Sequence, residues 1–382
     1  MRRKFLILSA VASVFFLAAS AGPVSAQSDE PDIAAPTAAE LQPLRPDAFV
    51  KAVVEKIVGE SQKEIAGIRQ KSQILEMRLL DGADKGKTVS IENADSVEAF
   101  RPAKVGDTYV VTRMPVGDAS QYFIYDNYRL NRLTVIFGIF FVIVFILGRK
   151  KGIASMVGLA VSIAVLEKYI VPGILHGGNP LTVTLLGSLA IMVVAMYLGH
   201  GVNMRTTIAF ISTVMALGVS YLFADVFVGY ARLFGAGSEA AFYLQYEPGF
   251  AVNLRGLLLG GIIIGTLGVL ADVTTAQVAS VEEIHNANRI LKTRDLYLRG
   301  LSVGREHIAS LVYTLALAYA GASLPLFLVF TINQAQPFWV VLNGENIAEE
   351  FVRTIVGSIG LMMAVPISTW IAAEVFSKDK AA

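Results

Sequence analysis

The sequence predicts an α-helical polytopic membrane protein with a small N-terminal β domain outside the cytoplasm, and three observations support this fold class. The 382 residues are 54% hydrophobic and only 16% charged, with a mean hydropathy of +0.58. These values lie outside the usual range of soluble domains. After Arg132 the chain contains long apolar segments close to the length that crosses a bilayer. Before Arg132 it contains short segments of alternating apolar and polar residues, which are typical of β-strands.

Residues 1–26 have the layout of a secretory signal. They start with basic residues, continue with an apolar run and end with small residues at Val24, Ser25 and Ala26. We expect cleavage after Ala26, with an uncleaved signal anchor as the alternative. Both interpretations place the following residues outside the cytoplasm.

Two further segments precede the membrane region. Residues 27–46 are rich in Ala and Pro and indicate a flexible tether. Residues 47–128 alternate apolar and polar positions around a Gly/Asp-rich turn in "ILEMRLLDGADKGKTVSIEN", which is typical of a hairpin. With the short segments that follow, this predicts a small β-barrel-like, OB-like domain. An exported domain does not meet nucleic acid, so we expect an extracytoplasmic protein as its partner.

Residues 129–376 form the expected transmembrane helical domain, followed by a cytoplasmic tail at 377–382. About seven spans are expected, each near the length that a bilayer requires. They lie at 133–148, 152–171, 181–199, 207–229, 254–273, 308–330 and 351–373.

The distribution of basic residues predicts the orientation of these spans. With the β domain outside, the cytoplasmic loops hold eleven Lys and Arg residues and the external loops only three, at Lys168, Arg232 and Arg255. Basic residues are enriched on the cytoplasmic side of membrane proteins. The C-terminus is therefore expected in the cytoplasm. The external segment 230–253 is expected to be an interfacial helix, a re-entrant lid or an aromatic belt with a loop.

The absence of several motifs limits the function. There is no cysteine, which excludes disulfides, thiolate metal sites and cysteine nucleophiles. The sequence contains no G-x-S-x-G, Walker A or H-E-x-x-H motif. We therefore expect no enzymatic activity, no cofactor and no bound metal.

A polar stretch at the end of the fifth expected span is the main candidate site. In "GTLGVLADVTTAQVASVEEIHNAN" (265–288), an acid, hydroxyls and an amide follow glycines and aliphatic residues. The expected pathway or hinge residues are Asp272, Thr274, Thr275, Gln277, Ser280, Glu282, Glu283, His285 and, from the fourth span, Asp225. Small residues four apart allow close helix packing, and the expected packing positions are Gly256, Gly260, Gly261 and Gly265.

Asp272 has two interpretations. On a continuing helix, it shares a face with Thr275 and the acids Glu282 and Glu283, and this polar strip would line a vestibule for an ion or solute. Alternatively, Asp272 caps a helix that begins at Val273, since Asp is a preferred N-cap residue. The two are compatible, because broken helices line cavities in transporters.

Three stretches resemble the YibE/F-like family of bacterial membrane proteins. They are "NYRLNRL" (127–133), "GTLGVLADVTTAQVASVEEIHNAN" (265–288) and "GREHIASLVYTLALAYAGASLPL" (304–326), with "DVTTAQ" as the most distinctive match. The resemblance covers about residues 47–376 and implies a multi-pass protein of the bacterial inner membrane. It implies no particular activity.

These observations favour a secondary transporter or permease for an unidentified small solute or ion, embedded in the lipid bilayer. The alternative is a non-transporting assembly or signalling protein whose exported β domain binds a partner. A membrane-embedded enzyme acting on lipid is less favoured, because Asp225 and Asp272 are expected near opposite faces of the membrane and no nucleophile accompanies them.

Overall fold

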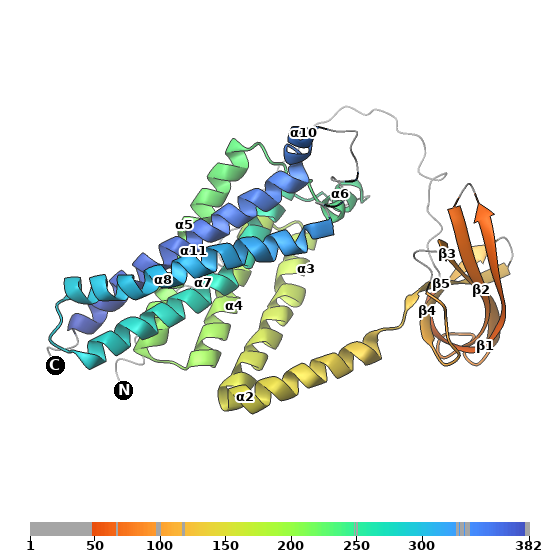
Figure 1. The fold of residues 1–382 in the computed structure, drawn as a ribbon, viewed down its shortest axis with the longest axis horizontal. Helices are drawn as coiled ribbons and strands as arrows, with labels where there is room; N and C mark the ends of the chain where they lie inside the picture. The colour runs from red at the N-terminus through yellow and green to blue at the C-terminus, as the bar shows by residue number, and fades with distance from the viewer. Residues whose placement is uncertain are drawn as a thin grey trace. The chain divides into compact units, whose positions relative to one another are not determined.

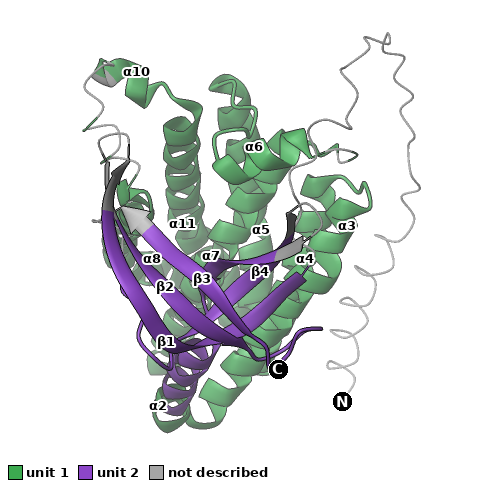
Figure 2. Ribbon diagram, turned by 90° about the vertical axis from the view of Figure 1, so that its right-hand side faces the viewer, with its two compact units in different colours: residues 1–19, 143–382 green, residues 20–142 purple. Residues whose placement is uncertain are grey.

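The structure is a computed structural model that divides into two compact units, residues 20–142 and residues 143–382 together with 1–19 (Figure 2). It describes residues 48–378, with gaps at 66–67, 97–100, 117–118, 248, 250, 326–327, 329–331 and 333–336. The expected signal (1–26), the tether (27–46) and most of the tail (377–382) therefore lie outside the described residues.

The first unit contains a five-stranded antiparallel sheet with the strand order β3-β2-β1-β4-β5. Its strands are β1 (Ala48–Ile65), β2 (Ile68–Leu79), β3 (Thr88–Ser96), β4 (Thr108–Val116) and β5 (Ala119–Asn127). Alternate residues of the strands point to one face. There Val54, Leu75, Met77, Ile91 and Val111 are at most 3% exposed and form the core.

The expected barrel is only partly formed. The sheet curves around its core (Figure 1), but β3 and β5 remain its edge strands in the part of the chain that is described. The unit is therefore an antiparallel half-barrel, and its described strands do not form the ladder of hydrogen bonds that closes a barrel.

The turn between β2 and β3 is tied to the rest of the sheet by Asp84. Lys87 Nζ donates to its Oδ1 at 2.5 Å and Tyr122 Oη to its Oδ2 at 2.6 Å. Hydrogen bonds from Lys87 and then Tyr122 hold the pKa of the Asp84 carboxyl below its usual range. Gly82 is required in this turn because its φ is +80° and a Cβ would meet Val50 Cγ1 at 2.5 Å.

The Asp84→Asn substitution should lower the stability of this turn at neutral pH and should make that stability less dependent on pH. A carboxyl with a lowered pKa stabilises the fold fully above its unfolded-state pKa of about 4, and the effect is lost as pH falls through the lower folded-state value. Amide protection of residues 79–88, corrected for intrinsic exchange rates, should fall at acid pH in the wild type. The control Glu92→Gln, at an exposed position of β3, should show the same loss of protection at acid pH as the wild type. If the protection of Asp84→Asn depended on pH as in the wild type, the role of Asp84 in this turn would be contradicted.

The second unit is helical. Its elements are α2 (Leu130–Val165), which begins in the first unit, the π-helical segment Leu166–Ile170, α3 (Val171–Leu175), α4 (Pro180–His200), α5 (Met204–Tyr230), α6 (Glu239–Tyr246), α7 (Leu254–Ala287), α8 (Thr293–Ala322), α10 (Phe338–Leu342) and α11 (Glu345–Lys378). Within the expected external segment 230–253, α6 is an eight-residue helix.

Asparagine caps start three of the long helices. Asn179 precedes α4, Asn203 precedes α5 and Asn253 precedes α7. Each side-chain oxygen accepts a backbone N–H of the first turn at 2.8–3.3 Å. Capping satisfies donors that have no partner inside the helix. The sequence therefore determines where these helices begin.

Helix α7 is the centre of the bundle, packing against α4, α5, α8 and α11 (Figure 1). Among its buried apolar residues, Ile263, Leu270, Val278 and Val281 are at most 1% exposed. Because α7 has neighbours around most of its circumference, its polar side chains must find partners inside the bundle.

Five of the described helical segments are long and apolar enough to cross a membrane. They are Leu130–Leu175, Pro180–His200, Met204–Tyr230, Leu254–Ala287 and Glu345–Lys378. The expected spans 133–148 and 152–171 both lie in the first segment, which is interrupted at Arg149 by a non-helical backbone (φ 50°, ψ −134°). The expected span 308–330 begins on α8 and runs into residues that are not described. Seven spans are therefore not confirmed.

Gly304→Ala should destabilise the bundle. A Cβ at Gly304 would lie 2.3 Å from Val365 Cγ1 and 2.9 Å from Gln277 Oε1, and overpacking of this kind costs about 1–3 kcal/mol. The thermal unfolding temperature of the purified protein should fall. Gly268→Ala is the matched control because no atom lies within 4 Å of its Cβ position. A wild-type unfolding temperature for Gly304→Ala would contradict this packing.

Candidate functional site

Three polar contacts join α5 and α7 along their length. They are Arg205 Nη1–Glu282 Oε2 at 3.6 Å, Thr213 Oγ1–Thr274 Oγ1 at 2.6 Å and Arg255 Nη2–Asp225 Oδ1 at 2.9 Å. The partners run in opposite directions along the two helices, as antiparallel packing requires. We call this set the α5–α7 seam. It has an ion pair near each end and a hydroxyl pair between them.

The hydroxyl pair is inside the bundle. Thr213 and Thr274 are both fully buried, and each hydroxyl also lies within hydrogen-bond distance of a carbonyl oxygen of its own helix, that of Ala209 and of Ala271. A buried hydroxyl without a partner would cost free energy, so these contacts allow polar atoms at this depth.

Gln277 joins three helices. Its side chain is 1% exposed, and Nε2 donates to Gly300 O on α8 and to Thr369 Oγ1 on α11, both at 2.8 Å. Its Oε1 is buried and accepts no hydrogen bond from the described residues. Gln277 is therefore a structural link that keeps one acceptor available in the interior.

Gln277→Met should weaken the contact of α7 with α8 and α11. Methionine has a similar volume but donates no hydrogen bond, so Gly300 O and Thr369 Oγ1 lose a partner at a cost of about 1 kcal/mol. Thermal unfolding in detergent measures this loss. Ser280→Ala is the control, because among the described residues the Ser280 hydroxyl bonds to Ala276 O of its own helix and to no other helix. Equal unfolding temperatures for the two variants would contradict the assigned role.

Asp272 does not lie with these buried groups. It is exposed in the described structure, whereas Thr274, Thr275 and Gln277 are buried. Gln277 is five residues further on, which places it about 140° around the helix. Helix α7 is continuous from Leu254 to Ala287, so the expectation that Asp272 caps a new helix is wrong.

The other expected residues have separate environments. Glu282 belongs to the α5–α7 seam, whereas Glu283 is exposed. His285 is 8% exposed, its ring stacks on Phe376 with centroids 6.4 Å apart, and its Nδ1 has no hydrogen-bond partner among the described residues.

Asp225 pairs with Arg255 on α7. Arg255 precedes Asp272 by 17 residues on that helix, or about 25 Å. Asp225 and Asp272 are therefore far apart along the bundle.

The four glycines expected at helix contacts differ from one another. A Cβ at Gly260 would lie 2.8 Å from Thr184 Oγ1 of α4, and one at Gly265 would lie 3.2 Å from Tyr319 Oη of α8. At Gly256 the nearest atoms belong to the capping residue Asn253. Gly261 has no atom within 4 Å of its Cβ position and lines a pocket instead.

The structure also shows a carboxylate clamp that the sequence analysis missed. In the loop 231–238 between α5 and α6, backbone N–H groups of Phe234, Gly235 and Ala236 donate to Glu345 Oε1 at 2.5, 2.9 and 3.4 Å. Gly237 N donates to Glu349 Oε1 at 2.9 Å. A Cβ at Gly235 would lie 2.3 Å from Leu254 O, so the loop requires glycine there. The acidic start of α11 therefore holds this loop in place.

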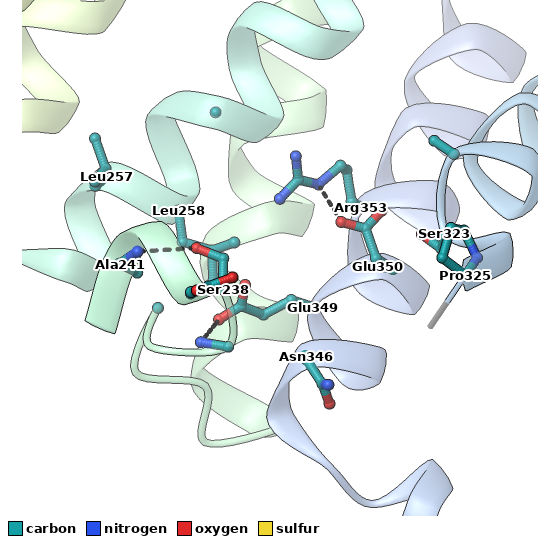
Figure 3. Close-up of a pocket in the computed structure, with 15 residues that line it drawn as sticks. Ser238, Ala241, Leu257, Leu258, Ser323, Pro325, Asn346, Glu349, Glu350 and Arg353 are labelled. Atoms are coloured by element: carbon teal, nitrogen blue, oxygen red, sulfur yellow. Dashed lines mark hydrogen bonds and ion pairs between the residues drawn. The ribbon is translucent and has the colours of Figure 1, made fainter. Parts of the chain in front are cut away.

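Beside the clamp lies a pocket of about 590 Å³ (Figure 3). It is lined by Gly235, Gly237, Ser238, Glu239, Ala241, Leu257, Leu258, Gly261, Ala322, Ser323, Pro325, Asn346, Glu349, Glu350 and Arg353. The available signal in the sequence was the charged pattern "ENIAEEFVR" (345–353) at the start of an apolar helix. Its partners come from segments about a hundred residues away, which a single sequence does not reveal.

A bundle with five helical segments able to cross a bilayer, and with paired polar side chains in its interior, is that of a polytopic membrane protein. A model of the family described as YibE/F-like protein matches residues 136–378, more than half of the chain. The chain belongs to the YibE/F-like family. The match covers the helical region and begins after the β domain, which the resemblance had included. Searches of curated proteins and of solved structures found no match.

Proposed function

We propose that this protein is a secondary transporter or channel-like permease for a small solute or ion. The observation that supports this proposal is the polar interior around α7, where Gln277 Oε1 has no hydrogen-bond partner among the described residues. Polar groups at membrane depth are costly, and in membrane proteins they mark substrate and ion pathways. Along the α5–α7 seam, this interior lies between two ion pairs.

We further propose seven spans in a bacterial inner membrane, with the β domain outside and the C-terminus in the cytoplasm. The break at Arg149 would turn the first helical segment into two spans, and α8 would supply another. The excess of basic residues in the expected cytoplasmic loops supports this orientation. In that topology the Arg205–Glu282 pair lies toward the cytoplasm and the Asp225–Arg255 pair toward the outside.

The two ion pairs would serve as alternating barriers. Opening one pair while the other stays closed would expose the polar interior to one aqueous side at a time, which is what coupled transport requires. The proposal includes no catalytic group, cofactor or metal. In this proposal the solute contacts Thr274 and Gln277 inside the bundle.

Flux in proteoliposomes tests the proposed transport. Vesicles containing the full-length protein are loaded with a pH-sensitive dye and exposed to proton, sodium or potassium gradients, alone and with a panel of small solutes. Wild-type vesicles should show flux above empty vesicles under at least one condition. Gln277→Met should lower it by about tenfold, the effect of one lost hydrogen bond in a dry interior. Ser280→Ala should retain it.

Equal amounts of folded protein in the vesicles must be verified, because Gln277→Met is also expected to be less stable. Flux that is no greater than in empty vesicles under every condition would overturn the proposal. Wild-type flux in Gln277→Met would show that the pathway lies elsewhere.

Exposed aromatic side chains on the β domain favour a second candidate function, the assembly of a partner protein outside the cytoplasm. Phe49, Phe123 and Tyr125 are 55%, 41% and 66% exposed, and the rings of Phe49 and Tyr125 are 5.0 Å apart edge to face. Because β1 pairs with both β2 and β4, we interpret the half-barrel as OB-like. A photocrosslinking residue at position 123 should capture one specific protein in cells; diffuse labelling would count against this candidate.

A further inference from the structure

The pocket beside the carboxylate clamp is separate from the buried groups around Gln277. Five segments contribute to it: the loop 231–238, the start of α6, the first turns of α7, the end of α8 and the start of α11 (Figure 3). Its volume of about 590 Å³ is within the range of small-molecule sites. Of the residues expected from the sequence, only Gly261 lines it.

Glu349 and Arg353 face this pocket without pairing with each other. Glu349 and Arg353 are four residues apart on α11, a spacing at which a carboxylate and a guanidinium usually meet. The structure shows no ion pair between them. Instead, Glu349 Oε1 accepts from Gly237 N at 2.9 Å, and Arg353 Nε lies 3.6 Å from Glu350 Oε1. The two charged groups are held apart by their other contacts.

Each of these groups has capacity left for a ligand. Glu349 is 5% exposed, and its Oε2 accepts no hydrogen bond from the residues that the structure describes. A cation or further donors at Oε2 would stabilise the ionised form of this buried side chain. Arg353 carries five N–H donors, and Figure 3 shows its terminal nitrogens pointing away from Glu350.

The rest of the pocket limits the size and polarity of a ligand. Leu257, Leu258 and Pro325 provide apolar surface that would contact a short hydrocarbon chain. Glu349, Glu350 and Glu239 outnumber the single cation Arg353, so an anion without a positive group would be repelled. The chemistry that matches all of these features has an ammonium group and an anionic group joined by a few methylenes.

We propose that this pocket binds a small zwitterion, with its ammonium group at Glu349 and its carboxylate or phosphate at Arg353. The molecule could be a free amino-acid-like solute or the phosphoethanolamine headgroup of a lipid, which share this chemistry. Binding does not depend on transport; only its identification as the transported solute rests on the proposed function.

Binding to the purified full-length protein tests this site. In maltoside detergent, the probes are the ω-amino acids from glycine to 6-aminohexanoate and O-phosphoethanolamine, with butylamine and butyrate as single-charge controls. Calorimetry and thermal shift should show saturable binding of at least one zwitterion. Its Kd should be at least about tenfold lower than that of either control, because each control loses one charge-assisted contact. In a second arm, phosphatidylcholine nanodiscs with and without phosphatidylethanolamine are compared.

Two variants locate the binding. Glu349→Gln keeps an oxygen for Gly237 N but removes the negative charge, and Arg353→Gln removes the guanidinium. Each should weaken binding of the best zwitterion at least about tenfold. Glu374→Gln is the control, since Glu374 pairs with Lys378 at the other end of α11. If Glu349→Gln does not fold, the binding affinity of Arg353→Gln tests the site by itself. This variant should fold because Arg353 is partly exposed.

The outcomes separate the two sources of the ligand. Stabilisation by soluble zwitterions supports a free solute, and stabilisation only in phosphatidylethanolamine nanodiscs supports a lipid headgroup. No binding in either arm, or wild-type binding in both charge variants, would overturn the proposal. Because binding is measured without a gradient, a negative flux experiment would leave this result intact, and the reverse also holds.

Discussion

The polar face of α7 sets the main constraint on the helical unit. This helix packs against four neighbours, yet it carries hydroxyl, amide and charged side chains. In a bilayer, water is not available to satisfy them, so partners must come from other helices. Thr213 on α5, Gly300 on α8 and Thr369 on α11 supply these partners. The positions of the neighbouring helices around α7 are therefore linked to its polar side chains.

Both ends of the bundle contain an ion pair of the α5–α7 seam, but two acids at one end have a different kind of partner. At the end that contains Arg205, Glu282 forms a partly exposed ion pair with that residue. At the other end, Glu345 and Glu349 are compensated mainly by backbone N–H groups of one loop. Backbone donors are fixed in place, so they orient a carboxylate without neutralising it with a full positive charge. Glu349 therefore lies beside the pocket with one backbone donor, Gly237 N, among the described residues.

Much of the architecture was predictable because it depends on local patterns. Apolar length and the asparagines before α4, α5 and α7 indicate where these helices begin, and strand alternation indicates the β domain. The polar stretch 265–288 lies almost wholly on α7, as one of its two interpretations expected. The sequence did not reveal which of its residues face a neighbouring helix: Asp272 is exposed, while Gln277 makes the interhelical hydrogen bonds. Periodicity defines the faces of a helix but not which face meets which neighbour.

The sequence by itself determined membership of a membrane class, the starts of α4, α5 and α7 and the presence of a polar stretch near the end of α7, because these follow from composition, capping and helical period. Only the tertiary structure decided that α7 is continuous, that its hydroxyls and amide are buried, and that Glu345 and Glu349 bind a loop about 110 residues earlier. Such contacts depend on packing between distant segments. A single sequence carries no record of which distant residues are neighbours in space.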